Sequence, residues 1–157
     1  MDYIIREMKK SEYIFLKDFL YEAIFIPQGM EDPPKSIVNI PELNIYISDF
    51  GSSIHDISLV SEIDEKLIGA VWVRIINDYG HIDDKTPSLA IGLYEEYRGK
   101  GIGTKLMEKI ISILIERKYK QVSLSVQKDN YAVKMYKKLG FEIFSENTEE
   151  YIMVKKL

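Results

Sequence analysis

Residues 98–103 read Arg98-Gly99-Lys100-Gly101-Ile102-Gly103, and this stretch decides the fold. It follows an apolar segment, 88–94, that is typical of a strand, and it leads directly into apolar residues at helical spacing. Three alternating glycines between a strand and a helix leave backbone N–H groups free to point at one anion, and the helix N-terminus adds partial positive charge there. The stretch therefore predicts a cradle for a phosphate or pyrophosphate. The alternative is a tight turn that uses glycine only for its positive φ.

Two common phosphate-binding motifs do not fit this stretch. A P-loop requires Gly-Lys-Ser/Thr after a four-residue gap, whereas Gly103 is followed by Thr104 and then Lys105. The dinucleotide motif Gly-x-Gly-x-x-Gly would need glycine at position 104, which is threonine. Neither of these two motifs therefore identifies the ligand of the cradle.

The rest of the chain alternates between strand and helix patterns. Alternating or continuously apolar segments predict strands at 3–6, 58–63, 67–76, 88–94, 120–126, 141–144 and 150–154. Helical spacing predicts helices from Ser11 through Leu20, over 35–49 with a break near Pro41, from Ile102 through Leu114, and over 130–139. Hairpins pair antiparallel and helical crossovers favour parallel pairs, so this order predicts a mixed sheet.

The first predicted helix has Ser11 as its N-cap. Its apolar face would consist of Ile14, Phe15, Leu16, Phe19 and Leu20. The last predicted helix carries Tyr136 on its apolar face and closes at Gly140, a typical C′ residue. The whole pattern predicts one α/β domain over residues 1–157, a twisted sheet flanked by about four helices.

Composition excludes several classes of function. The 157 residues contain no cysteine, which removes disulfides, thiolate metal sites and thiolate nucleophiles. Two histidines argue against a zinc site, and 21 basic against 25 acidic residues give a net charge of −4, which argues against nucleic-acid binding. The N-terminus lacks a secretory pattern, and the longest apolar runs, 67–73 and 110–115, are too short to span a bilayer. We expect a cytoplasmic protein with no metal and no membrane partner.

Two motifs together resemble a known family. The stretch 98–103 resembles the R/Q-x-x-G-x-G/A signature of the GNAT superfamily of N-acetyltransferases. Residues 130–141, with Asn130, Ala132, Tyr136, Gly140 and Phe141, resemble its second motif, N-x-A…Y-x-x-x-G-F. One long helix and one strand separate the motifs, as in the family, and the whole chain matches the family in length and element order.

The resemblance implies a single three-layer GNAT domain that transfers an acetyl group from acetyl-CoA to a primary amine by direct attack. The alternative is a non-catalytic module of the same fold that binds acyl-CoA for sensing or assembly. In both cases acetyl-CoA or its analogue is the ligand of the glycine stretch, and no metal is involved. The acceptor would be a small-molecule or peptide amine, and exposed edge strands would allow a homodimer.

The resemblance also assigns residues to the cofactor. The CoA pyrophosphate would bind the backbone N–H groups of Arg98, Gly99, Lys100, Gly101, Ile102, Gly103 and Thr104. The strand ending at Leu93 and Tyr94 would pair with the pantetheine arm, and the N–H of Leu93 would polarise the thioester carbonyl. Asn130 would contact the pantetheine, cap the second helix, or do both.

Tyr136 is the implied general acid for the departing CoA thiolate, and a core aromatic is the alternative. Proton transfer from a phenol of pKa near 10 to a thiolate whose thiol has a pKa near 8.5 is uphill by about 2 kcal/mol, so Tyr136 could mainly position the sulfur. Some relatives place a glutamate where this chain has Ser125, and residues 86–88 also lack a carboxylate. The base would then be a water chain held by backbone carbonyls or Ser125, or a carboxylate from elsewhere.

The acceptor pocket of this fold is formed by the first two helices, their loop, and the loop before the glycine-motif strand. These segments carry Glu22, Glu31, Asp32, Asp78, His81, Asp83 and Asp84. Of these, Glu22, Glu31, His81 and Asp83 are the candidates for the substrate site. Acidic residues there would suit a cationic amine, and ordinary solvated loop charge is the alternative.

Overall fold

A seven-stranded mixed sheet forms the centre of the computed structural model, which describes residues 2–157. The strands are β1 (Ile4–Glu7), β2 (Ile57–Ile63), β3 (Lys66–Arg74), β4 (Ser88–Leu93), β5 (Gln121–Gln127), β6 (Glu142–Glu146) and β7 (Glu150–Lys156). Their order across the sheet is β1-β2-β3-β4-β5-β7-β6. Neighbouring strands are antiparallel except for β4 and β5, which are parallel, so the predicted mixed sheet is confirmed.

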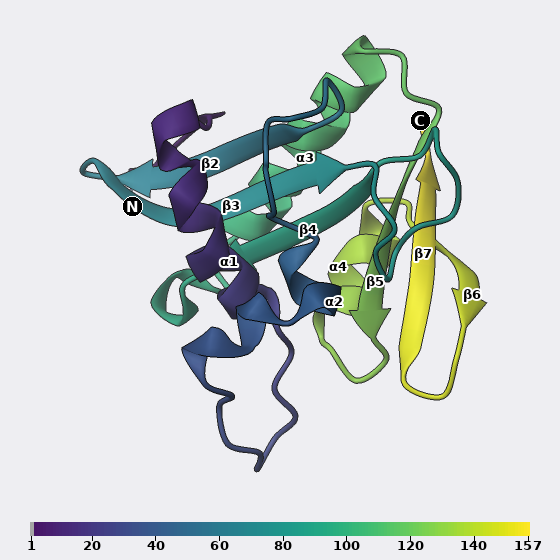
Figure 1. The fold of residues 1–157 in the computed structure, drawn as a ribbon, viewed down its shortest axis with the longest axis horizontal. Coiled ribbons are helices and arrows are strands. Elements are labelled where there is room, and N and C mark those ends of the chain that lie inside the picture. Colours follow the sequence, from purple (N-terminus) through teal and green to yellow (C-terminus); the bar gives the residue numbers. More distant parts are fainter. Residues whose placement is uncertain (1) are drawn as a thin grey trace.

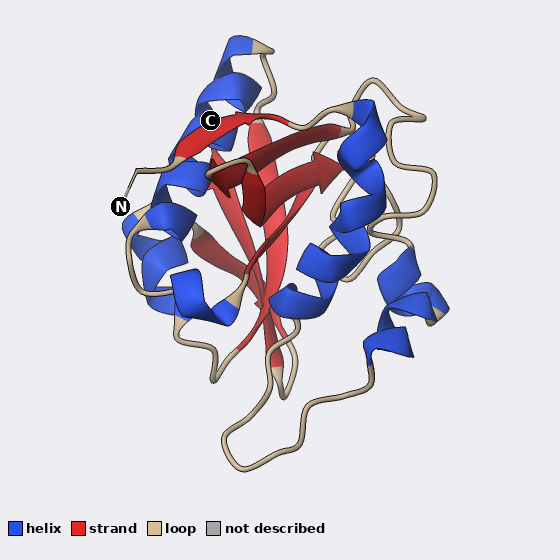
Figure 2. Ribbon diagram, turned by 90° about the vertical axis from the view of Figure 1, so that its left-hand side faces the viewer, coloured by secondary structure: helices blue, strands red, loops and turns tan. Residues whose placement is uncertain are grey.

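Helices cover both faces of the sheet, as Figure 2 shows. They are α1 (Leu16–Ala23), α2 (Pro41–Asn44), α3 (Ile102–Glu116) and α4 (Ala132–Lys138). Short 3₁₀ helices span Lys10–Phe15, Lys35–Asn39 and Glu95–Tyr97. In Figure 1, α1 and α2 lie in front of the sheet, and α3 lies behind it. The three-layer α/β architecture with four helices is confirmed.

Each helical layer closes its own hydrophobic core, because strand side chains alternate between the two faces of the sheet. Behind the sheet, the predicted face of α3 is buried at every expected position: Ile102, Leu106, Ile110 and Leu114. In front, Phe19 and Leu20 of α1 pack with Val60, Ala70 and Trp72. The sequence periodicity therefore predicts the buried face of α3 in full, and on the front face it predicts Leu16, Phe19 and Leu20 correctly.

The first helix differs from the expectation. Residues 10–15 form a 3₁₀ helix and the α-helix begins only at Leu16, so Ser11 is not its N-cap. Ile14 and Phe15, placed on the apolar face by helical spacing, are 65% and 45% exposed. The reason is geometric: three residues per turn point these side chains in other directions than an α-helix would. The predicted break near Pro41 is confirmed, since Pro41 opens α2 as its first residue, but the predicted helix over 35–49 is wrong in extent: 35–39 is a 3₁₀ helix and 45–49 is a series of turns.

The parallel pair β4–β5 is joined only at its beginning. Ser88 lies opposite Ser123, whose N–H donates to Pro87 O at 3.0 Å, and no further register pairs follow. Figure 1 shows β2–β4 running across the view while β5 and β7 stand nearly upright, so the two halves of the sheet diverge. A gap therefore opens between the C-terminal ends of β4 and β5, in the middle of the sheet.

Helix α1 sits directly on β4 beside this gap. A Cβ atom at Gly92 would lie 2.0 Å from Phe19 O, so only glycine allows the helix backbone to approach this closely. This contact brings the C-terminal end of α1 to the edge of the gap.

The strands β1 and β6 are the outer edges of the sheet, and every residue of β6 is exposed. The homodimer that such edges would allow stays a prediction. Within residues 2–157, no helix combines the length and apolar character needed to cross a membrane.

Candidate active site

The glycine stretch forms the turn between β4 and α3. Gly99 and Gly101 have φ values of +72° and +84°, a left-handed conformation that other residues adopt only with strain. Gly101 precedes the first residue of α3, and Lys105 is the first to donate its N–H to a helical carbonyl, that of Gly101. The N–H groups of Ile102, Gly103 and Thr104 are therefore left without helical acceptors, as at any helix start. They are available to an anion.

Arg98 ties this turn to the rest of the site. Its Nε donates to Leu93 O at 3.0 Å, and its Nη2 donates to Glu22 O at 3.0 Å and to the Glu22 carboxylate at 3.1 Å. The side chain thus joins the end of β4 to the end of α1. Because these hydrogen bonds occupy the guanidinium, Arg98 contributes to an anion site by holding the glycine turn in place.

The edge of β4 that faces the gap carries unpaired backbone groups. The N–H of Tyr94 donates to Ile68 O on β3 at 3.1 Å. Since N–H groups alternate in direction along an antiparallel strand, those of Leu93 and Ile91 point away from β3, toward β5. There β5 has already diverged. An extended chain could bind this edge in the manner of an added strand.

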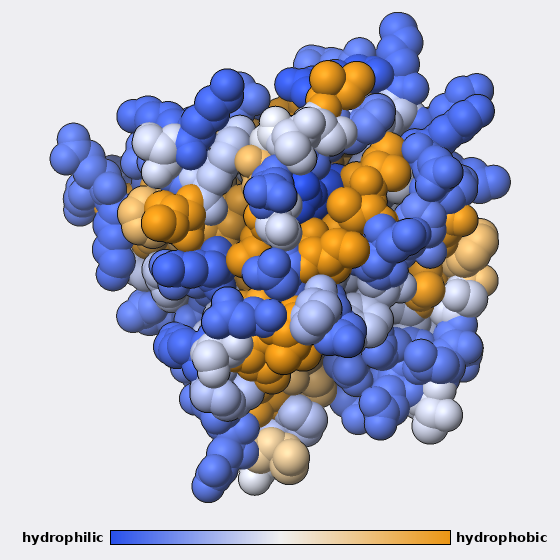
Figure 3. Space-filling model, in the orientation of Figure 1, coloured by the Kyte–Doolittle hydropathy of each residue, from blue (hydrophilic) through white to orange (hydrophobic). Residues whose placement is uncertain are grey.

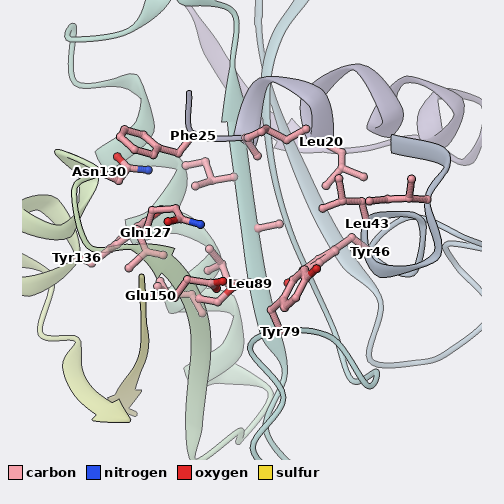
Figure 4. A pocket seen from close by; sticks show the side chains of 18 residues that line it. Leu20, Phe25, Leu43, Tyr46, Tyr79, Leu89, Gln127, Asn130, Tyr136 and Glu150 are labelled. Carbon is pink, nitrogen blue, oxygen red and sulfur yellow. The ribbon is translucent and has the colours of Figure 1, made fainter. Parts of the chain in front are cut away.

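Two cavities meet at the gap. The larger, of about 1060 Å³, extends from the glycine turn between α1, the end of β4 and the start of α4. The smaller, of about 300 Å³, lies between α1, α2, β4 and β5. The residues that line both cavities mark their junction: Ala23, Ile24, Phe25, Ile91, Asn130 and Tyr136. In Figure 4, which shows the smaller cavity, Asn130 and Tyr136 lie on one side and Tyr46 and Tyr79 on the other. We call the two spaces the glycine-turn cavity and the inner cavity.

Tyr136 packs in the core and also lines both cavities. Its ring is 7% exposed and lies 5.9 Å from that of Phe141, measured between centroids. Burial raises the pKa of Tyr136 well above its ordinary value, so the phenol stays neutral at any physiological pH. Its hydroxyl makes no hydrogen bond within residues 2–157, which leaves it able to donate to a ligand.

Asn130 caps the start of the following helix. Its Oδ1 accepts the N–H of Ala132 at 2.9 Å, which is the capping role considered from the sequence. Asn130 also lines both cavities, so its side-chain amide can face a ligand at the same time.

The inner cavity contains different residues from those expected around an acceptor. Ser125 lies in its wall, but Glu31, His81 and Asp83 line neither cavity. Glu22 lines only the glycine-turn cavity, where its carboxylate is paired with Arg98.

The fold of the loop 77–87 explains this outcome. Ser123 Oγ donates to Gly80 O at 2.6 Å, which draws the loop backbone onto β5. The Asp83 carboxylate accepts the N–H of Lys85 at 2.8 Å, and His81 Nε2 lies 3.6 Å from Asp84. These side chains serve the loop itself rather than the cavity.

Sequence reasoning missed Tyr46 and Glu150, which do line the inner cavity. Glu150 reaches it because β7 pairs with β5, in a register that places Glu150 opposite Gln127. Tyr46 follows α2 in a segment of turns, where no residue pattern marks it. Within the described part of the chain, no group of three or more His, Asp or Glu side chains could hold a metal ion.

Residues 23–141 match the family described as "Acetyltransferase (GNAT) family". The match covers more than half of the chain, so this protein belongs to the GNAT acetyltransferase family. Membership supports acyltransferase activity.

Relatives in other organisms agree with this assignment. An uncharacterized N-acetyltransferase of Archaeoglobus fulgidus is 28% identical over 137 residues, 83% of this chain and 88% of the relative. A mycothiol acetyltransferase of Corynebacterium efficiens is 35% identical over 80 residues, 50% of this chain and 25% of the relative. This chain thus spans about a quarter of the length of the mycothiol acetyltransferases that it matches.

Solved structures share the fold over nearly the whole chain. The PaiA N-acetyltransferase of Thermoplasma acidophilum, in complex with coenzyme A, superimposes with a TM-score of 0.74 at 22% identity, covering 100% of both chains. The ribosomal-protein-S18-alanine N-acetyltransferase of Escherichia coli gives a TM-score of 0.70 at 16% identity, covering 99% of this chain and 94% of the other. At these identities the likeness shows the fold alone.

The glycine turn can be tested with two matched substitutions. Gly101 and Gly29 both have φ of +84°, and a Cβ on either would meet nothing within 4 Å, but only Gly101 lines a cavity. We predict that Gly101→Val raises the KM for acetyl-CoA about 10-fold or more, because the side chain stands where the anion would approach the backbone. Gly29→Val controls for backbone strain and should leave this KM unchanged. Equal effects of the two substitutions, or none of either, would exclude the turn as the anion site.

Proposed function

We propose that this protein transfers an acetyl group from acetyl-CoA to a primary amine by direct attack, without a covalent enzyme intermediate. The observation that carries the proposal is the junction of two cavities at Tyr136, one starting at an anion-binding helix N-terminus and the other separate from it. Such an arrangement lets two substrates enter by different routes and meet. The coenzyme A bound in the PaiA structure supports acetyl-CoA as one of them.

The residues at the glycine turn fit the anionic part of acetyl-CoA. The free N–H groups of Ile102, Gly103 and Thr104 would bind the pyrophosphate, with the exposed Lys100 beside them. The free N–H groups on the β4 edge would bind the pantetheine arm. We therefore retain the predicted cofactor residues Leu93, the glycine turn and Asn130, but not the backbone N–H groups of Tyr94 and Arg98, which already donate to Ile68 O and Glu95 O at 3.1 Å each.

The β4 edge also supplies a donor for the thioester carbonyl. The sequence resemblance places this role on the N–H of Leu93, but Leu93 lines only the glycine-turn cavity. Ile91 lines both cavities, and its N–H also points into the gap. We assign binding of the pantetheine arm to the N–H of Leu93 and binding of the thioester carbonyl to the N–H of Ile91. The N–H of Ile91 would stabilise the negative charge that develops on the carbonyl oxygen during attack.

The transfer needs no nucleophile from the protein, in keeping with a chain that contains no cysteine. The amine nitrogen forms a bond to the acetyl carbonyl carbon, the carbon–sulfur bond breaks, and the sulfur leaves as a thiolate. The neutral phenol of Tyr136 would donate a hydrogen bond to that sulfur. Because burial raises the pKa of Tyr136, full proton donation is more costly than for a free phenol, and we assign it mainly the stabilisation of the thiolate.

The second candidate function is binding of acyl-CoA without turnover. The open inner cavity argues for catalysis, since a module that only holds the cofactor needs no second cavity at Tyr136.

Release of the CoA thiol from acetyl-CoA, measured with a panel of primary amines, tests the proposal. We predict amine-dependent release, and a kcat about 10²-fold lower in Tyr136→Phe with the KM for acetyl-CoA nearly unchanged. Tyr3→Phe, on the N-terminal side of β1, is the control. Because the pKa of Tyr136 lies well above 10, the rate should not fall through its ionisation up to about pH 9.

Two results would contradict this function. Tight CoA binding without turnover of any amine would support the binding module. Unchanged turnover in Tyr136→Phe would remove Tyr136 from the mechanism.

A further inference from the structure

We infer that the acceptor is a primary monoamine with a compact, apolar carbon body. This inference rests on the proposed function and concerns the inner cavity. At about 300 Å³ the cavity has the size of a small ligand site. The walls decide the chemistry of the ligand.

The walls combine apolar side chains with polar groups. The apolar side chains come from α1 and the two residues after it, from α2 and the residue before it, and from β4: Leu20, Ile24, Phe25, Ile40, Leu43 and Leu89. Figure 4 shows Leu20, Phe25, Leu43 and Leu89 around the space, and Figure 3 shows apolar surface in the middle of this face, surrounded by hydrophilic side chains. Burying an apolar body here releases water from both surfaces, at about 25 cal/mol for each Å².

One carboxylate, Glu150, stands among the described residues that line the cavity. It forms no ion pair within residues 2–157, so it is free to attract one ammonium group. Glu42 and Glu150 also help to raise the pKa of Tyr79, after burial, so negative charge gathers around that hydroxyl. A second ammonium on the same ligand would find no second carboxylate among the described lining residues, and an unpaired charge is costly there. The cavity thus favours one positive charge over two.

Two amines of nearly equal length separate these possibilities. Hexylamine ends in a methyl group where 1,5-diaminopentane carries its second ammonium. We predict a kcat/KM at least about 10-fold higher for hexylamine, and turnover of 2-phenylethylamine as well. Equal or better turnover of the diamine, or of an alanyl peptide alone, would overturn this inference while the proposed function stands. No turnover of any amine would overturn both.

The charge of Glu150 can be tested by itself. Glu150→Gln should raise the KM for hexylamine about 5- to 10-fold and leave that for acetyl-CoA unchanged. Glu149→Gln is the matched control, since the same charge is removed at the next residue, outside both cavities. Equal KM values for hexylamine in the two variants would contradict the role of Glu150.

A second, independent observation concerns Asp78, in the loop behind the inner cavity. Ser88 Oγ donates to Asp78 Oδ2. The other carboxylate oxygen, Oδ1, is buried and has no hydrogen-bond partner within residues 2–157. An unpaired buried acceptor is costly, so a native structure usually gives it a use.

Two hydroxyl groups connect this carboxylate with the inner cavity. The Asp78 carboxylate and the Ser125 hydroxyl both act on the pKa of Tyr46, which burial raises, so the Tyr46 hydroxyl is close to each of them. Tyr46 and Ser125 line the cavity. A path of exchangeable protons thus leads from the cavity wall to the buried carboxylate.

We propose that Asp78 accepts the proton that the attacking amine loses. The bound ammonium group passes a proton to Ser125, Ser125 passes its own to Tyr46, and Tyr46 passes its own to Asp78, which leaves a neutral nitrogen to attack. When the amide forms, the nitrogen loses a second proton to the departing sulfur, so the products are an amide, the CoA thiol and a neutral Asp78, which later releases its proton to solvent. The need for such a path is clear: an amine of pKa near 10.4 is only about 0.1% neutral at pH 7.4.

The surroundings of Asp78 suit a proton acceptor. Burial raises the pKa of this carboxylate, while the hydrogen bond from Ser88 and the nearby Tyr46 and His81 side chains oppose the rise. Tyr46 and His81 are the titratable groups that act on Asp78, so a pH experiment must separate the three.

The pH dependence of kcat/KM for hexylamine provides the test. Asp78→Asn should lower kcat/KM at pH 7 about 10²-fold and move the ascending limb of the profile toward the pKa of the free amine. Tyr46→Phe should move the limb in the same direction by breaking the path. His81→Gln should leave the limb in place, and Asp64→Asn, in the exposed β2–β3 turn, should behave as the unaltered protein does.

The outcomes separate a proton path from a structural role. The proposal would be overturned if Asp78→Asn had the pH profile of the wild-type protein. It would also be overturned if the ascending limb of the pH profile moved in His81→Gln and not in Asp78→Asn. If Asp78→Asn lowers the melting temperature, its lower rate could come from a destabilised fold. The pH profile of Tyr46→Phe then tests the proton path, because this variant keeps the Asp78 carboxylate. An unshifted limb in Tyr46→Phe would then contradict the path.

Discussion

The divergence of β4 from β5 is the constraint on which the rest of the structure depends. The two strands share one register pair, Ser88 with Ser123, and then separate. Inside a sheet this leaves backbone N–H groups, those of Ile91 and Leu93, without the partners that buried groups normally have. Such groups are costly unless a ligand takes the place of the missing strand, so the gap is at once a defect of the sheet and a binding edge.

The neighbouring elements keep the gap open and direct it. Gly92 lets α1 rest on the backbone of β4, which brings Ala23 and Phe25 to the junction of the cavities. Arg98 joins the ends of β4 and α1, so the glycine turn has a fixed position relative to the gap. On the other side, β7 supports β5 along its full length and carries Glu150 to the inner cavity. The glycine turn, the free edge of β4 and the inner cavity are therefore connected through the residues that line both cavities.

Local patterns predict much of this structure. The seven strands and four helices lie close to their expected positions, because the spacing of apolar residues along the chain follows which side chains are buried. The glycine turn can also be predicted from the sequence, since the positive φ values at Gly99 and Gly101 favour glycine. Residues 10–15 and the predicted helix over 35–49 are the exceptions in the fold, because spacing alone does not distinguish a 3₁₀ helix or a series of turns from an α-helix.

The acceptor side is less predictable because it depends on contacts between distant segments. Acidic loop residues such as Asp83 look suited to an amine, yet local hydrogen bonds turn them to the loop itself. Glu150 reaches the cavity through strand register, and Asp78 gains its surroundings from Tyr46, Ser88 and Ser125, which are far apart in the chain. Tertiary placement, rather than residue type, selects these side chains.

Amide hydrogen exchange resolved by residue tests the central claim most directly. In the free protein, the N–H of Tyr94, bonded to Ile68 O, should exchange slowly, while those of Ile91 and Leu93 should exchange rapidly. Adding CoA should slow exchange at Ile91 and Leu93 about 10-fold or more and change Tyr94 little. If exchange at Ile91 and Leu93 stayed equally rapid with CoA bound, the claim that the ligand occupies the place of the missing strand would be contradicted.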